Sequence, residues 1–404
     1  MRNRTTSLPA ALVGLTSTVR RAATQTVPRM GPLRWRPSPG FYERAADPGI
    51  GVPGTVVADE RIDAFWLPGL RLRADAWRIL YRSTRLTDEP TLVSGTVLVP
   101  RGRVRGVVAY APGTHGLANY SAPSRLITRG LDWETTFVAR LLAQGHAVVM
   151  TDYEGLGTPG DHPYVIGRTL GRNVLDALRA ARAFEAAGLG HDLPLGVFGY
   201  SEGGHAAAWA AELHATYAPE LEIAGIAAGS VPSDLEAAGD HVEGTLYSFF
   251  AGYGALGINA AYPDLGLESY LTPEGETYMH RLRRSSIVTA MLRGPHFVGV
   301  DELMTENVLR RPDWQARMRE NRLGCGSAPS APVYLYTSKR DPLVPPAQTR
   351  DLAVRWRARG ADVTLTEVPA LEHVTGMLLG GEGAARWLHG RLRDHVAGQV
   401  AASA

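Results

Sequence analysis

The chain has 404 residues, of which 45% are hydrophobic and 20% charged, and its formal net charge is +2 at pH 7. This is the composition of a globular chain long enough for one large domain or two ordinary ones. The small net charge, without a long basic block, excludes the electrostatic surface that nucleic-acid binding needs. The single cysteine, Cys325, excludes an internal disulfide.

Residues 1–60 are rich in arginine, proline and glycine and show no sustained periodicity, which predicts a leader that wraps over the surface. Arg2 and Arg4 precede a short apolar run at residues 8–15, but Pro9 interrupts this run, so the segment matches a signal peptide poorly. A secreted or cell-envelope location and a cytoplasmic one both stay open. No stretch approaches the roughly eighteen apolar residues that a membrane span requires, so we expect no transmembrane segment.

The next part of the chain alternates between strand and helix patterns. Two strands that are close in sequence, 77–82 and 91–99, are expected to pair antiparallel. The following strands are predicted at 106–111, 146–151, 195–198 and 223–228, with helices over 136–142, 174–184 and 202–217 between them. Such alternation predicts an α/β fold, with a mostly parallel central sheet and helices on both faces.

The alternation stops between residues 232 and 329 and then resumes. Strands are predicted at 333–336 and 363–368, with helices over 347–358 and from about residue 380. A long insertion on the side where parallel strands end is typical of a cap over a site, although an independent domain is the alternative. We therefore divide the chain into the leader at 1–60, a core at 61–231 and 330–404, and a cap at 232–329.

Residues 199–203 read Gly-Tyr-Ser-Glu-Gly and stand between the strand at 195–198 and the helix at 202–217. This strand, sharp turn and helix form the pattern of a nucleophile elbow, in which a strained turn exposes a serine hydroxyl. The small flanking residues allow neighbouring segments to come close. The pattern predicts Ser201 as a nucleophile.

A serine hydroxyl attacks only when a histidine takes its proton and a carboxylate orients that histidine. In this fold the acid and the histidine follow the serine in that order, each on a loop after a strand. Asp341 and His373 satisfy this order. Glu372 is a competing acid, but its adjacency to the histidine disfavours it, and His205 is interpreted as a packing residue.

The oxyanion of an ester reaction needs fixed hydrogen-bond donors. The backbone N–H of Glu202, directly after the nucleophile, is the first expected donor. The second is expected from the loop after the strand at 106–111, where Thr114 and His115 are candidate side chains. We find no metal-ligand spacing and no nucleotide-binding glycine motif, so no metal and no cofactor are predicted.

Five stretches of the chain form a recognisable set: 151–155, 199–205, 217–221, 341–345 and 372–373. Together they resemble the secretory lipase family of the α/β-hydrolase superfamily. The resemblance implies a triad of Ser201, Asp341 and His373, a helical cap, and hydrolysis of carboxylic esters that include acylglycerols. It also implies a secreted or cell-envelope protein in transient contact with lipid interfaces. In one departure, Pro112 stands where bacterial members have a histidine, and His115 follows three positions later.

The sequence thus predicts a serine ester hydrolase, an esterase or lipase, that works through an acyl-enzyme with a small-molecule ester or lipid as its substrate. Two alternatives remain. An acyltransferase would use the same acyl-enzyme and a different acceptor, and a catalytically inactive hydrolase fold would serve for binding. Phe249, Phe250 and Tyr253 are candidates for the wall of an acyl pocket or for the core of the cap. The chain-length preference and the oligomeric state are not predicted.

Overall fold

The computed structural model describes residues 40–293, 296–370 and 372–403. Its internal contacts separate residues 1–41 from a second unit, Tyr42–Ala404, and the description below concerns this second unit. The apolar run at 8–15 and most of the predicted leader lie outside the described residues.

A nine-stranded sheet organises this unit, in the order β1-β4-β5-β7-β6-β8-β9-β10-β11. From β7 to β11 neighbouring strands run parallel, whereas β1, β4 and β5 form an antiparallel edge. The predicted antiparallel pair is confirmed in β4 and β5. The strands are β1 (Val56–Ile62), β4 (Ala74–Thr84), β5 (Pro90–Pro100), β6 (Gly106–Ala111), β7 (His146–Thr151), β8 (Leu195–Tyr200), β9 (Ile223–Gly229), β10 (Val333–Ser338) and β11 (Val363–Val368), with a separate hairpin of β2 (Phe65–Leu67) and β3 (Leu70–Arg71).

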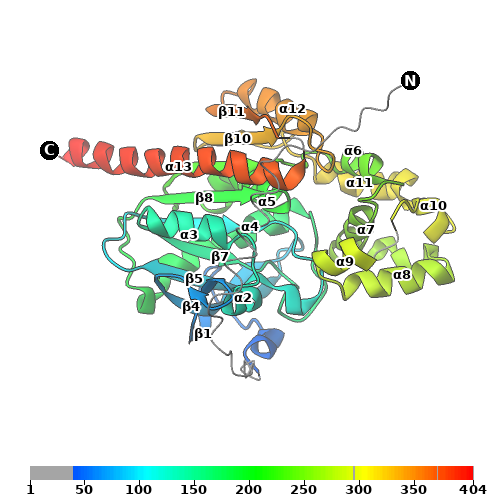
Figure 1. The fold of residues 1–404 in the computed structure, drawn as a ribbon, viewed down its shortest axis with the longest axis horizontal. Coiled ribbons are helices and arrows are strands. Elements are labelled where there is room, and N and C mark those ends of the chain that lie inside the picture. The colour runs from blue at the N-terminus through cyan, green and yellow to red at the C-terminus, as the bar shows by residue number, and fades with distance from the viewer. Residues whose placement is uncertain (1–39, 294–295, 371, 404) are drawn as a thin grey trace, which may run out of the picture. The chain divides into compact units, whose positions relative to one another are not determined.

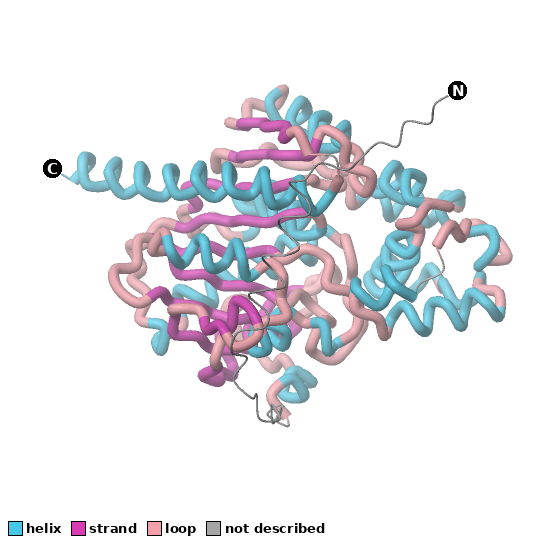
Figure 2. The backbone as a smooth tube through the Cα atoms, viewed as in Figure 1, coloured by secondary structure: helices cyan, strands magenta, loops and turns pink. Residues whose placement is uncertain are grey.

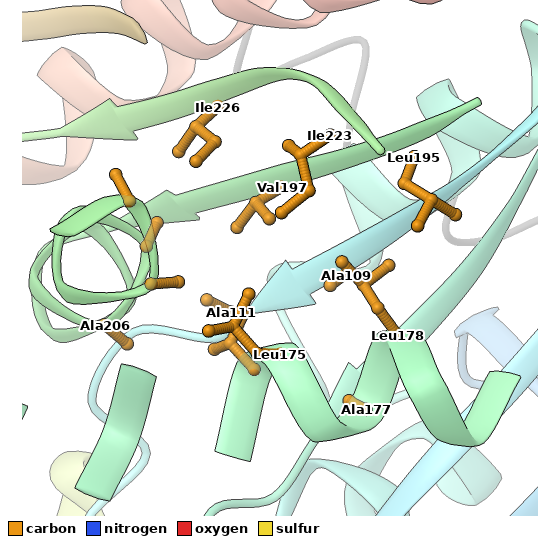
Figure 3. Close-up of a cluster of buried hydrophobic side chains, with 14 of the residues drawn as sticks. Ala109, Ala111, Leu175, Ala177, Leu178, Leu195, Val197, Ala206, Ile223 and Ile226 are labelled. Carbon is orange, nitrogen blue, oxygen red and sulfur yellow. The ribbon is translucent and has the colours of Figure 1, made fainter. Parts of the chain in front are cut away.

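Helices cover both faces of the sheet, as predicted, because the central strands are apolar on both sides. In β6, Ala109 packs with one face cluster and Tyr110 with the other, as the alternation of side chains along a strand requires. Figure 3 shows the first cluster, where Leu175 and Leu178 approach Ala109 and Ala111. Helices α4 (Gly167–Ala183), α5 (Glu202–Tyr217) and α12 (Pro346–Arg357) contribute to this cluster, and α3 (Thr135–Ala143) and α13 (His373–Ser403) contribute to the second.

The helices that follow β9 have a core of their own. It is built around Phe249, Tyr253 and Trp314, each of which is fully buried. Figures 1 and 2 show these helices gathered beyond one end of the strands. They are α6 (Leu235–Val242), α7 (Phe249–Ala261), α8 (Pro273–Arg283), α9 (Ile287–Arg293), α10 (Val300–Leu303) and α11 (Pro312–Glu320). The short helix α2 (Pro123–Leu126) instead packs against the strands β5 and β7.

Two elements differ from the prediction. Strand β1 begins at Val56, inside the stretch assigned to the leader, and pairs antiparallel with β4. Helix α13 begins at His373, not near residue 380. Its glycines allow close packing, since a Cβ at Gly376, Gly380 or Gly381 would overlap Ser338, Tyr336 or Phe137 respectively. None of the helices in the described ranges is long and apolar enough to cross a membrane.

Candidate active site

Ser201 occupies a sharp turn between β8 and α5. Its backbone has φ 59° and ψ −120°, which is a strained conformation for a residue with a side chain. The amide of Ser201 donates to the carbonyl of Gly229 at 2.9 Å. A Cβ at Gly199 or Gly203 would overlap a backbone oxygen, of Gly203 or Ala111 respectively, so the turn needs glycine at both positions.

Asp341 follows β10 and contacts His373, with 2.7 Å between Oδ2 and the ring Nδ1. Its Oδ1 accepts from the amides of Leu343 and Val344, and the hydroxyl of Ser230 lies 3.0 Å from Oδ2. Burial alone would raise the pKa of Asp341. The hydrogen bonds from His373 and from the two amides outweigh burial and hold this pKa below its ordinary value.

His373 is the first residue of α13, and it lies beside the elbow. The hydroxyl of Tyr200, the residue before the serine, donates to the carbonyl of His373 at 2.7 Å, and the two ring centroids are 4.9 Å apart. The structure therefore brings the predicted serine, aspartate and histidine to one place. The sequence placed His373 on a loop, but here the histidine starts a helix.

The competing residues have other contacts. Glu372 accepts from the amides of Val374 and Thr375 at 2.9 and 2.6 Å, and so caps the first turn of α13. His205 is fully buried, and its ring nitrogens lie 2.9 and 3.0 Å from the carbonyl oxygens of Pro232 and Val165. These contacts fit the packing role expected for His205.

The loop after β6 lies against the elbow, since a Cβ at Gly113 would be 3.2 Å from the carbonyl oxygen of Tyr200. The Thr114 hydroxyl lies 3.0 Å from that of Tyr164. The side chain of Glu202 is buried, and its carboxylate contacts the His162 ring at 2.8 Å. The backbone N–H of Glu202 is therefore the group that can donate to an oxyanion.

Both ring nitrogens of His115, the other candidate side chain for the oxyanion, contact groups of the protein. Its Nδ1 lies 2.8 Å from the carbonyl of Gly113, and its Nε2 lies 3.3 Å from Oδ1 of Asp132. Glu134, which the sequence analysis did not single out, accepts the Gly113 amide with both carboxylate oxygens, at 2.9 and 3.1 Å.

An apolar cavity begins at Ser201 and extends between α6 and α7, enclosing about 680 Å³ of space with its open mouth included. Phe250 lines it, whereas Phe249 and Tyr253 belong to the core of the helices that follow β9. Most of the other lining residues are apolar or small: Val165, Pro232, Leu235, Ala238, Gly239, Val242, Ala251, Gly254, Ala255, Ile258, Leu309, Met318, Leu343 and Val344.

Two further carboxylates at a strand end support loops. Asp152 accepts from the Ser94 hydroxyl at 2.6 Å and from the Ser124 amide at 2.7 Å, and Glu154 pairs with Arg85 at 3.1 Å. Within the described ranges, no group of three or more histidine, cysteine, aspartate or glutamate residues is arranged to hold a metal ion.

Comparison with known proteins identifies relatives of this architecture. A structure of Candida antarctica lipase A in its closed state superposes with a TM-score of 0.75 at 23% identity, covering 83% of each chain. A rice cell wall degrading esterase from Xanthomonas oryzae gives a TM-score of 0.71 at 20% identity, covering 83% of this chain and 97% of the esterase. Both likenesses support the α/β-hydrolase fold.

Two relatives in sequence bear on the chemistry. A protein of Mycobacterium tuberculosis named as a probable inactive lipase is 29% identical over 375 residues, covering 88% of this chain and 83% of the relative. A secreted triacylglycerol lipase of Malassezia globosa is 29% identical over 362 residues, covering 85% of this chain and 78% of the relative. The family model described as secretory lipase matches residues 120–399. The chain therefore belongs to the secretory lipase family, a family of carboxylic ester hydrolases with the α/β-hydrolase fold.

Proposed function

We propose that this protein hydrolyses acyl esters such as acylglycerols through an acyl-enzyme on Ser201. The observation that carries the proposal is the contact between Asp341 and His373 beside a serine held at positive φ, at the end of an apolar cavity. Because Nδ1 of His373 faces a carboxylate, Nδ1 carries the proton and Nε2 is the nitrogen left to act as a base.

The reaction proceeds in two halves. Nε2 of His373 takes the proton of Ser201 as Oγ attacks the ester carbonyl, and the resulting imidazolium protonates the departing alcohol. In the second half His373 activates water, which releases the fatty acid and restores the serine. Asp341 holds the ring in place and stabilises its positive charge. The backbone N–H groups of Glu202 and Thr114 hold the oxyanion in both halves.

The cavity supports an acyl chain as the substrate group that enters the protein. Its walls are hydrocarbon, and the small residues of α6 and α7 leave room for an unbranched chain. The names of the Malassezia relatives agree with a triacylglycerol substrate. On this basis we assign the cap role to residues 232–329, since α6 and α7 form one wall of the cavity.

We further propose transient contact with lipid surfaces. Helix α9 exposes Val288, Met291 and Leu292, and the second turn of α13, which begins at the proposed base, exposes Leu378 and Leu379. Exposed apolar side chains on neighbouring turns of a helix fit the surface of a lipid phase.

The test is hydrolysis of p-nitrophenyl esters, from acetate to palmitate, by the wild type, by Ser201→Ala and by Ser330→Ala as an exposed control. We expect Ser201→Ala to lower kcat by at least about 10³-fold and the control to leave it unchanged. Activity retained in Ser201→Ala would refute the assignment of the nucleophile.

The same assay separates the alternatives. A wild type that cleaves no ester would favour the inactive binding fold, consistent with the name of the mycobacterial relative. An added alcohol that captures nearly all of the acyl group in place of water would favour acyl transfer.

A further inference from the structure

Three buried titratable groups meet at the loop after β6, and none of them belongs to the proposed triad. His115 is 5% exposed, and Asp132 and Glu134 are each 1% exposed. Buried charges are unfavourable unless other groups pair with them and hydrogen-bond to them. Their contacts with the loop therefore require an explanation.

Two of the groups, Glu134 and His115, hold one glycine from two sides, and Asp132 contacts the His115 ring. The Gly113 amide donates to both oxygens of Glu134, and the Gly113 carbonyl faces Nδ1 of His115. A carbonyl only accepts, so Nδ1 must donate, while Nε2 faces the Asp132 carboxylate and is also suited to donate. A ring that donates from both nitrogens is an imidazolium. Burial would lower the pKa of His115, but Asp132 and Glu134 outweigh burial and raise it to about 9.

This arrangement fixes the direction of the next amide. The peptide bond between Gly113 and Thr114 is planar and trans, so its C=O and its N–H point in opposite directions. When His115 binds the Gly113 carbonyl, the Thr114 N–H is directed away from the His115 ring. In the part of the chain that the structure describes, the Thr114 amide donates to no other group. By contrast, the Gly113 amide is already used by Glu134.

The opposite side of the loop is fixed by the cap. The amide of Ile287 donates to the carbonyl of His115 at 2.9 Å, and the amide of Leu117 donates to the carbonyl of Ser285 at 3.1 Å. The loop is therefore held between the buried charges and the junction of α8 and α9. The Gly113–Thr114 peptide, which faces the elbow, therefore has little freedom to rotate.

We propose that His115, Asp132 and Glu134 are positioning residues of the oxyanion site, which orient the Gly113–Thr114 peptide so that the Thr114 N–H meets the developing oxyanion. The proposal rests on the ester hydrolysis proposed above. It assigns His115 a different role from the direct oxyanion contact considered from the sequence, since both ring nitrogens are engaged elsewhere.

A pair of substitutions at His115 separates orientation from general support of the fold. The amide nitrogen of asparagine takes about the place of Nδ1, and that of glutamine takes about the place of Nε2. His115→Asn therefore keeps a donor for the Gly113 carbonyl, whereas His115→Gln keeps one only for Asp132.

We expect His115→Asn to retain kcat for p-nitrophenyl butyrate within about fivefold of the wild type. His115→Gln should lower kcat by about 30-fold or more, with KM changed by less than about threefold, because loss of one oxyanion donor lowers kcat about 10²- to 10³-fold. The inactivation rate with diethyl p-nitrophenyl phosphate should fall in parallel, since its phosphoryl oxygen takes the oxyanion position. His146→Gln, at another buried histidine, is the matched control and should leave kcat unchanged.

Equal kcat values for the two His115 variants, or a loss seen only in KM, would overturn the proposal. Should His115→Gln not fold, Glu134→Gln and Glu134→Leu make the same comparison on the other side of Gly113. The glutamine keeps an acceptor for the amide and should be at least tenfold more active than the leucine, and equal activities would again overturn the proposal. Failure of the proposed function is a different result, because the wild type itself would then hydrolyse no ester.

Discussion

Gly254 offers the sharpest test of the acyl cavity. It lies within α7 on the cavity wall, and a Cβ built on it would meet no atom within 4 Å. A leucine at this position would therefore project into open space. The helix should tolerate the change, because the helix propensity of leucine is more favourable than that of glycine by about 1 kcal/mol.

The magnitude follows from the carbon atoms that the new side chain displaces. A leucine side chain has four carbons and so excludes about four methylenes of a bound acyl chain. At about 0.8 kcal/mol for each methylene, the loss is about 3 kcal/mol, or about 200-fold in kcat/KM. Only esters whose acyl chain is long enough to reach Gly254 should lose this binding free energy.

The assay is kcat/KM for the p-nitrophenyl series from acetate to palmitate with Gly254→Leu. We expect palmitate to fall about 200-fold and acetate to change less than about threefold. Gly390→Leu is the matched control, since Gly390 is another glycine within a helix, α13, with open space at its Cβ. Equal losses on all esters, or no loss on palmitate, would refute the assignment of this cavity to the acyl chain.

The remaining predictions concern the acid and the lipid surface. Asp341→Asn should lower kcat by about 10⁴-fold, because an amide does not stabilise the required tautomer of His373. Since folding lowers the pKa of Asp341, its carboxylate stabilises the fold above about pH 4 and loses this contribution as the pH falls through the folded pKa. The difference in Tm between the wild type and Asp341→Asn should therefore shrink from pH 6 to about pH 3, and a constant difference would contradict the argument. Leu379→Ser should lower hydrolysis of an emulsified triacylglycerol about tenfold and leave hydrolysis of p-nitrophenyl acetate unchanged. Val354→Ser, at an exposed position of α12, is the control and should change neither rate. A parallel loss on the soluble ester would indicate damage to the site itself.

The sequence predicted the core of the fold because its signals are local. The runs that form β6 to β10 are short, apolar and separated by helical patterns, and the glycines around Ser201 mark the turn. The positions of Asp341 and His373 follow from one topological rule, since the carboxyl ends of parallel strands meet at one edge of the sheet. The structure brings these two residues together, as this rule requires.

The start of α13 could not be predicted in the same way. Glycine disfavours a helix by about 1 kcal/mol relative to alanine, so a stretch with Gly376, Gly380 and Gly381 argues against one. Contacts distant in the sequence reverse this preference, because these glycines let the helix approach the side chains of Ser338, Tyr336 and Phe137. Glu372 adds a cap at the first turn.

The groups around Gly113 show why a histidine near a proposed site is ambiguous in a sequence. A ring beside a flexible glycine loop suggests direct contact with substrate, and no periodic pattern links residue 115 to residues 132 and 134. The partners come from the irregular segment before α3, and Glu134 lies 21 positions from the amide that it accepts. Loop 112–116 must hold a backbone donor still without a regular element to support it. The Glu134 carboxylate from outside the loop and the His115 imidazolium within it meet this need, because charged groups bind backbone groups more strongly than neutral side chains do. Residues of this kind are found by following the hydrogen bonds of the backbone that faces a reaction, and not by searching for reactive side chains.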